Sequence, residues 1–110
     1  MPVNSRRKGA RSERELAKKL NEYGFECRRG VQYSGIEGED VVGLPFIHIE
    51  CKNVQRLNLR DAMDQSMRDA KEDQIPVVMH KKDRQPWLVT LNLDDFMNFY
   101  KAWLRWWKEE

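Results

Sequence analysis

The sequence predicts an α/β domain in which helices pack on a mixed β-sheet, with the element order α-β-β-β-α-β-β-α. Two observations predict this architecture. Segments with helical periodicity alternate with short apolar segments that are bounded by glycine or proline. A central hairpin is followed by a helical crossover into another strand, which requires a parallel strand pair. The 110 residues can form one core, and no apolar run approaches the roughly 20 residues of a membrane span. We therefore expect a single domain that has no membrane partner.

The first helix is expected from about Ala10 to Tyr23 because its apolar residues recur at helical spacing. Ser12 and Glu15 have the spacing of a capping box, and Gly24 is a natural stop. Residues 1–9 are basic and lack an apolar stretch. They predict a mobile basic arm rather than a secretory signal, and we expect a cytoplasmic protein.

Three strands are expected next, at about 25–31, 40–42 and 46–52, with a glycine-rich loop between the first two and a turn at 43–45. Alternation along the third strand divides its side chains between two faces. One face carries Ile47, Ile49 and Cys51, and the other carries Phe46, His48, Glu50 and Lys52.

The second half of the chain predicts a helix at about 59–74 with Asn58 as its N-cap. Strands are expected at 77–79 and 87–91, joined by a polar turn. The last helix, at about 93–108, carries aromatic residues over roughly half of its circumference, more than packing on one sheet requires. This excess predicts a homodimer held partly by the last helix, although a small core that uses both sides of the helix would give the same pattern.

The net charge of +2 is unevenly distributed. Residues 1–30 carry nine Lys/Arg and four Asp/Glu, whereas residues 31–50 carry four Asp/Glu and no Lys/Arg. A basic region beside an acidic one predicts a polyanion partner and a bound cation, with a solvated charged surface as the alternative. Cys27 and Cys51 lack the number and spacing of a disulfide framework or a zinc site.

The hairpin at residues 40–50 carries the strongest chemical signal. If its turn centres on Pro45, Asp40 lies directly opposite Glu50, and their Cβ atoms are about 4.5–5.5 Å apart. Two carboxylates at that distance repel by roughly 3 kcal/mol at an effective dielectric constant near 20. Lys52 lies on the same face and supplies one positive charge. A divalent ion with hard oxygen ligands, Mg²⁺ or Mn²⁺, would supply the rest.

Glu13 lies inside the apolar stripe of the first helix, between Ala10, Leu16 and Ala17. It is therefore expected to point toward the sheet. A carboxylate on the buried side of a helix needs a partner. Either a metal pocket or a salt bridge to an Arg or Lys at the edge of the core would provide one.

The set Asp40, Glu50 and Lys52 resembles the PD-(D/E)xK nuclease motif. The segment 7–16, followed by Tyr23-Gly24-Phe25, is similar to the opening of archaeal-type Holliday junction resolvases, the Hjc group. Residues 65–70, 76–78 and 83–89 look like small phage or prophage members of this group. The resemblance implies a restriction-endonuclease-like fold, so that residues 1–110 form one nuclease domain, and a homodimer.

The resemblance also implies roles for individual residues. It places metal ligands at Glu13, Asp40, Glu50 and the carbonyl of Cys51, and catalytic residues at Lys52, Glu13 and Ser34. Gln65 is implied as support for the site, although a polar helix-surface residue is the simpler interpretation. The implied cofactor is Mg²⁺, with Mn²⁺ as a substitute.

The expected DNA contacts come from the arm, the first helix and the turn near His80, with Arg14 matching an arginine that the family uses on DNA. They are Arg6, Arg7, Lys8, Arg11, Arg14, Lys81, Lys82 and Arg84. His48 shares the face of Glu50, but packing beside Phe46 is the favoured interpretation.

Together these features predict a metal-dependent endodeoxyribonuclease that resolves four-way DNA junctions. A nicking or repair endonuclease on other branched or mismatched DNA is an alternative. A DNA-binding module without catalysis is less consistent with the sequence, because acidic groups in a DNA-facing pocket oppose simple binding.

Overall fold

The computed structural model describes residues 5–30 and 40–109 and confirms the predicted element order. Five strands form one sheet in the order β1-β2-β3-β4-β5. They are β1 (Arg28–Arg29), β2 (Val41–Val42), β3 (Ile47–Asn53), β4 (Ile75–Lys81) and β5 (Leu88–Leu91). The β3–β4 pair is parallel and the other pairs are antiparallel, which makes the sheet mixed as expected.

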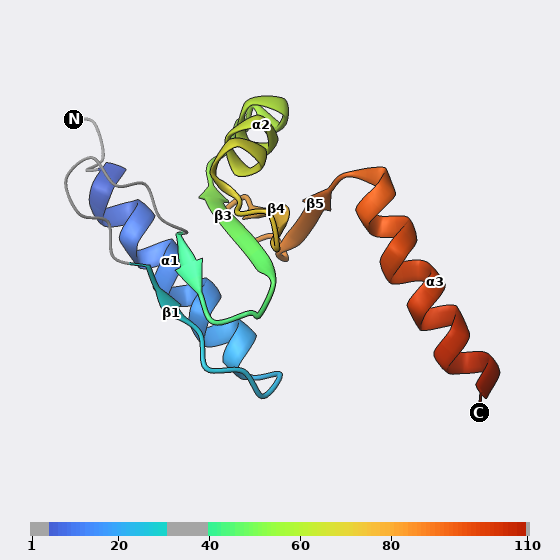
Figure 1. The fold of residues 1–110 in the computed structure, drawn as a ribbon. Coiled ribbons are helices and arrows are strands. Elements are labelled where there is room, and N and C mark those ends of the chain that lie inside the picture. Colours follow the sequence, from blue (N-terminus) through green and yellow to red (C-terminus); the bar gives the residue numbers. More distant parts are fainter. Residues whose placement is uncertain (1–4, 31–39, 110) are drawn as a thin grey trace.

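Helix α1 (Ser5–Asn21) covers one face of the sheet, and α2 (Leu59–Asp69) covers the other (Figure 1). Helix α1 begins five residues earlier than predicted, so residues 5–9 are helical rather than part of an arm. Arg and Lys are good helix formers, and this extends the helix through Gly9. The predicted capping box is therefore wrong: Ser12 is buried within the helix, where its Oγ accepts a hydrogen bond from Asn53 Nδ2 at 3.1 Å.

Asn58 caps α2 as predicted, and its side chain accepts a hydrogen bond from the Asp61 N–H at 3.1 Å. The helix ends at Asp69 rather than near Gln74, because Ala70 is already extended. The residues after Ala70 form the turn that leads into β4, whose second residue is Pro76. Pro76 restricts Ile75, the first residue of β4, to an extended conformation; it lies too far along the chain to set the end of α2 at Asp69.

The turn between β2 and β3 approaches the chain just before β1. Gly43 has φ +124°, and a Cβ there would lie 2.5 Å from the Glu26 carbonyl oxygen. Only glycine allows this approach. Phe46 was expected to begin the third strand, but it has φ 67° and belongs to the turn. The strand begins one residue later and continues one residue further, to Asn53.

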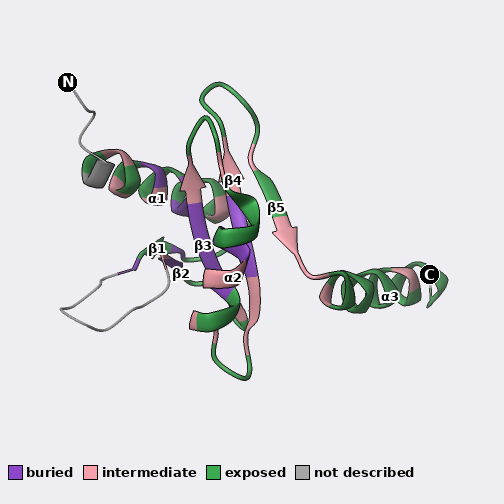
Figure 2. Ribbon diagram, turned by 90° about the horizontal axis from the view of Figure 1, so that it is seen from above, coloured by how far each residue is buried: buried purple, intermediate pink, exposed green. Residues whose placement is uncertain are grey.

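The core lies on both faces of the sheet, and β3 is buried on both (Figure 2). The α1 side is the larger cluster. It comprises Leu16, Ala17, Cys27, Val41, Ile49, Cys51, Val77 and Met79. On the other side Ala62 and Met63 of α2 pack on Val78, and the buried Ser66 Oγ donates to the Val77 carbonyl at 2.9 Å. The second face is therefore more polar, and it is the face of Glu50 and His48.

Helix α3 (Leu93–Glu109) projects from the end of β5, away from the sheet (Figure 1). None of its described residues is buried. Its exposed rings contact one another along the helix: Phe96, Tyr100 and Trp103 stack in succession, and Trp107 meets Trp103 edge-on. No helix in the described part of the chain is long and apolar enough to cross a membrane.

Candidate active site

The predicted hairpin register is confirmed. Val41 pairs with Ile49, which places Asp40 opposite Glu50, and the Asp40 N–H donates to the Ile49 carbonyl at 3.2 Å. The β2 strand begins only at Val41. Asp40 lies just before β2, and its side chain extends the hydrogen bonding to β3: its Oδ2 accepts a hydrogen bond from the Cys51 N–H at 2.9 Å. This bond fixes the side chain at the edge of β3.

Burial and, next, the negative charge of Glu50 raise the pKa of Asp40 to about 7, against the opposing effect of the hydrogen bond from the Cys51 N–H. This like-charge repulsion is the one expected from the sequence. A carboxyl group with a pKa of about 7 is about half protonated at pH 7 when no cation is near. A cation bound by Asp40 and Glu50 can therefore take the place of this proton.

Glu50 is 2% exposed and lies next to two further potential ligands. Its Oε1 is 3.3 Å from the Nε2 of His48, which is 1% exposed. Among the described residues, His48, Glu50 and Asp69 form a group that could hold a metal ion, because one potential ligand atom from each lies within 4.8 Å of the others. His48 was expected to pack beside Phe46, but Phe46 is 66% exposed and the neighbour of His48 is Glu50.

Glu13 is mostly buried on α1 and lies 3.6 Å from Arg29 of β1. Of the two interpretations of Glu13, the structure displays the salt bridge to an arginine at the edge of the core. Burial raises the pKa of Glu13, while Arg29 lowers it part of the way. The charges of Glu50 and Lys52 also act on Glu13, so it lies within electrostatic reach of the hairpin site.

Lys52 follows Glu50 on the same face of β3 and is half-buried. Its strand neighbour Asn53 points toward α1, where it is hydrogen-bonded to Ser12. This contact holds α1 beside the end of β3. The thiol of Cys51 is buried among carboxylates, which raises its pKa to about 12 and makes it chemically inert. The predicted role of the Cys51 carbonyl as a ligand stays a prediction.

The donor set fits a hard divalent cation. Asp40 and Glu50 offer carboxylate oxygens, and burial followed by the charge of Glu50 raises the pKa of Asp40, so a bound cation would favour its charged form. The His48 ring and the Asp69 carboxylate add further potential donor atoms close to Glu50. Oxygen ligands suit Mg²⁺ and Mn²⁺, and an imidazole is more acceptable to Mn²⁺ than to Mg²⁺.

The basic residues expected to contact DNA lie in two segments that the fold brings together. Lys8 of α1 is 4.0 Å from Asp83 in the turn between β4 and β5. Among the residues expected to contact DNA, those exposed on these two segments are Arg7, Arg11, Arg14, Lys82 and Arg84. Lys81 instead lies over the Trp87 ring at 5.7 Å. The side chain of Arg6 lies outside the described residues, as does Ser34.

Two polar residues take positions that the sequence only partly indicated. Gln65 is half-buried on α2, the helix that packs on the face of Glu50. Asp69, at the end of the same helix, was not predicted at all. Its proximity to Glu50 depends on how α2 lies across the sheet, and no local pattern encodes that placement.

A family described as phage putative PDDEXK endonuclease matches residues 4–107 of the chain. Among solved structures, Hjc, a Holliday junction resolvase from the archaeal hyperthermophile Archaeoglobus fulgidus, is similar. The two chains share 26% sequence identity with a TM-score of 0.57, and the match covers 74% of each. No curated protein matches the chain. The expected resemblance and the restriction-endonuclease-like fold are thereby confirmed.

Proposed function

The chain belongs to the family of phage PDDEXK endonucleases, and on this premise we propose that it is a metal-dependent DNA endonuclease that resolves four-way junctions. One observation carries the proposal. The hairpin register places Asp40 and Glu50 together, with Lys52 on the same face. The similarity to the archaeal resolvase supports the choice of substrate. We expect it to act in the cytoplasm, where phage DNA would be available.

Asp40 and Glu50 would hold the ion, with Glu13 and the Cys51 carbonyl as the further ligands that the family resemblance implies. Mg²⁺, or Mn²⁺ in its place, would act as a Lewis acid on the scissile phosphate and lower the pKa of the attacking water. The hydrogen bond from the Cys51 N–H fixes one Asp40 oxygen, and His48 lies against one Glu50 oxygen. Both carboxylates are thus oriented before the substrate arrives.

Lys52 would orient the attacking water and offset the negative charge that develops on the phosphate. Its position two residues after Glu50 directs it to the same face of the sheet. Glu13 is partly neutralised by Arg29. We therefore assign Glu13 to a supporting role in holding the ion or a water molecule, and Gln65 to support of the site from α2.

The exposed cations of α1 and of the turn between β4 and β5 would bind the DNA backbone. Lys8 lies 4.0 Å from Asp83, so these two segments are side by side. Backbone contacts of this kind neutralise phosphates and are independent of sequence. They suit an enzyme that selects its substrate by shape.

A cleavage assay tests the proposal. A labelled four-way junction and its linear duplex arms are incubated with Mg²⁺, with Ca²⁺ or with EDTA. We expect cutting of the junction in Mg²⁺ alone, and binding without appreciable cutting in Ca²⁺. Cutting that persists in EDTA would refute the metal site. Equal cutting of the junction and the linear arms would favour the alternative of a nicking or repair endonuclease.

We further propose that the enzyme is a homodimer that uses α3. The rings of Trp103, Trp106 and Trp107 are more than half exposed, and aromatic residues are enriched in interfaces. Two sites related by a two-fold axis would allow paired cuts in a junction. Light scattering should give twice the chain mass of 13.2 kDa. Trp106→Ser with Trp107→Ser should reduce it to the monomer mass; an unchanged dimer would place the interface elsewhere.

A further inference from the structure

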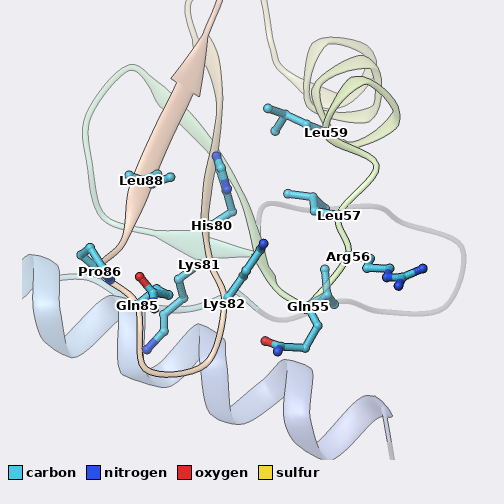
Figure 3. A pocket seen from close by; sticks show the side chains of 11 residues that line it. Gln55, Arg56, Leu57, Leu59, His80, Lys81, Lys82, Gln85, Pro86 and Leu88 are labelled. Atoms are coloured by element: carbon cyan, nitrogen blue, oxygen red, sulfur yellow. The ribbon is translucent and has the colours of Figure 1, made fainter.

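A pocket of about 700 Å³ lies between the segment that joins β3 to α2 and the turn that joins β4 to β5 (Figure 3). Leu57 and Leu59 line one side and Leu88 lines the other. Figure 3 shows these side chains pointing toward one another, with the His80 ring between them. The volume is typical of pockets that bind small organic molecules. The pocket therefore has room for a planar ring.

The pocket combines an apolar interior with positive charge at its mouth. Arg56 and Lys82 line it and are exposed, and no carboxylate belongs to its described lining. His80 Nε2 lies 2.9 Å from Thr90 Oγ1, which fixes the ring. Burial lowers the pKa of His80, which favours the neutral ring. An apolar floor, a fixed neutral ring and two cations match the chemistry of a nucleobase joined to phosphates.

The pocket also lies next to the candidate active site. In the parallel β3–β4 pair, Lys52 is the direct partner of His80, so both side chains are on the same face. Neighbouring strands are about 4.8 Å apart, and successive nucleotides of one DNA strand rise by about 3.4 Å. A strand whose scissile phosphate lies at Lys52 would therefore bring its next one or two nucleotides to the pocket.

We propose that this pocket binds an unstacked nucleobase of the DNA strand, one or two nucleotides from the scissile phosphate. The inference rests on the proposed nuclease function and specifies its substrate. The enzyme would prefer DNA in which a base can leave the stack at low cost, as beside a branch point, rather than continuous duplex. Unstacking costs least where the base is already unpaired, and the pocket would compensate that cost by stacking on His80.

Two neighbouring residues of β5 allow a matched test. Leu88 and Val89 are 57% and 55% exposed. Leu88 pairs with His80 and faces the pocket, whereas Val89 pairs with Met79 and faces the other way. Leu88→Asp and Val89→Asp add the same charge to the same strand. Leu88→Ala tests the pocket without adding a charge.

The probe is a four-way junction with 2-aminopurine at each nucleotide flanking the mapped cut, bound in Ca²⁺. We expect the fluorescence of one flanking position to change on binding to the wild-type protein. Leu88→Asp should abolish that change and weaken binding about tenfold, which is within the contribution of one base stack. Leu88→Ala should likewise reduce the fluorescence change and weaken binding. Val89→Asp should leave both the fluorescence change and the affinity intact.

The outcomes separate this inference from the proposed function. A wild-type protein that cuts the junction without any fluorescence change, and Leu88 and Val89 variants that bind alike, would overturn the pocket and leave the nuclease function in place. A wild-type protein that neither binds nor cuts DNA would overturn both.

Discussion

Replacing Asp40 with asparagine should stabilise the metal-free protein at alkaline pH while it abolishes cleavage. The pKa of Asp40 is about 7 in the folded protein, against an ordinary value of 3.8. Between these values the folded protein holds a proton that the unfolded chain releases. The free energy of unfolding of the wild type therefore falls as pH rises through this window, by about 1.36 kcal/mol per pH unit.

The magnitude follows from the width of the window. From pH 5 to pH 8 the free energy of unfolding of the wild type should fall by roughly 2–3 kcal/mol. That of Asp40→Asn should not show this loss, because an amide has no charge to bury. The amide oxygen can still accept the hydrogen bond from the Cys51 N–H. For a domain of this size, the difference in melting temperature between Asp40→Asn and the wild type should grow by about 10 °C or more from pH 5 to pH 8.

Thermal unfolding in EDTA at pH 5 and pH 8 measures the effect. Asp73→Asn is the matched control because Asp73 is exposed, and its difference from the wild type should be small and equal at both pH values. Adding Mg²⁺ at pH 8 should stabilise the wild type, by about 2.7 kcal/mol at 100 times the dissociation constant, and should not stabilise Asp40→Asn. An Asp40→Asn protein that is less stable than the wild type at pH 8, or equally changed at both pH values, would refute the reasoning.

Four further predictions concern the reaction. Glu50→Gln should abolish cutting of the junction but retain binding in a gel-shift assay, because it removes a ligand together with repulsion of phosphate; normal cutting would exclude Glu50 as a ligand. Lys52→Ala should lower single-turnover cleavage by orders of magnitude with little change in affinity, whereas an equal loss of affinity would make Lys52 a simple DNA contact. Neutralising Arg6, Arg7 and Lys8 should reduce the slope of log affinity against log salt by about one unit per lost contact, and an unchanged slope would exclude this cluster from the interface. Calorimetry should show that Mn²⁺ affinity falls about tenfold per pH unit below pH 7, since the ion competes with the proton of the site; affinity independent of pH would contradict the raised pKa.

The sequence predicted those features that depend on local pairing. The register of Asp40 with Glu50 follows from the short turn between their strands, and Asn58 as the N-cap follows from its own side chain. The ends of the helices were less predictable, because α1 continues through Gly9 toward the N-terminus without a clear start signal. Asp69 could not be found beside Glu50, because that contact is set by the packing of a helix across a sheet.

The charges around the hairpin explain why these carboxylates are buried together although burial opposes stability. Glu13, Asp40, Glu50 and Asp69 bring four carboxylates together, against two positive charges on Arg29 and Lys52. The carboxylates outnumber the cations, and the proton that Asp40 binds near pH 7 removes part of the excess negative charge. A divalent ion that replaced this proton would neutralise the excess and remove the repulsion of a phosphodiester. The repulsion that destabilises the empty fold would thus become affinity for the ion, which is the exchange of stability for function expected at a catalytic site.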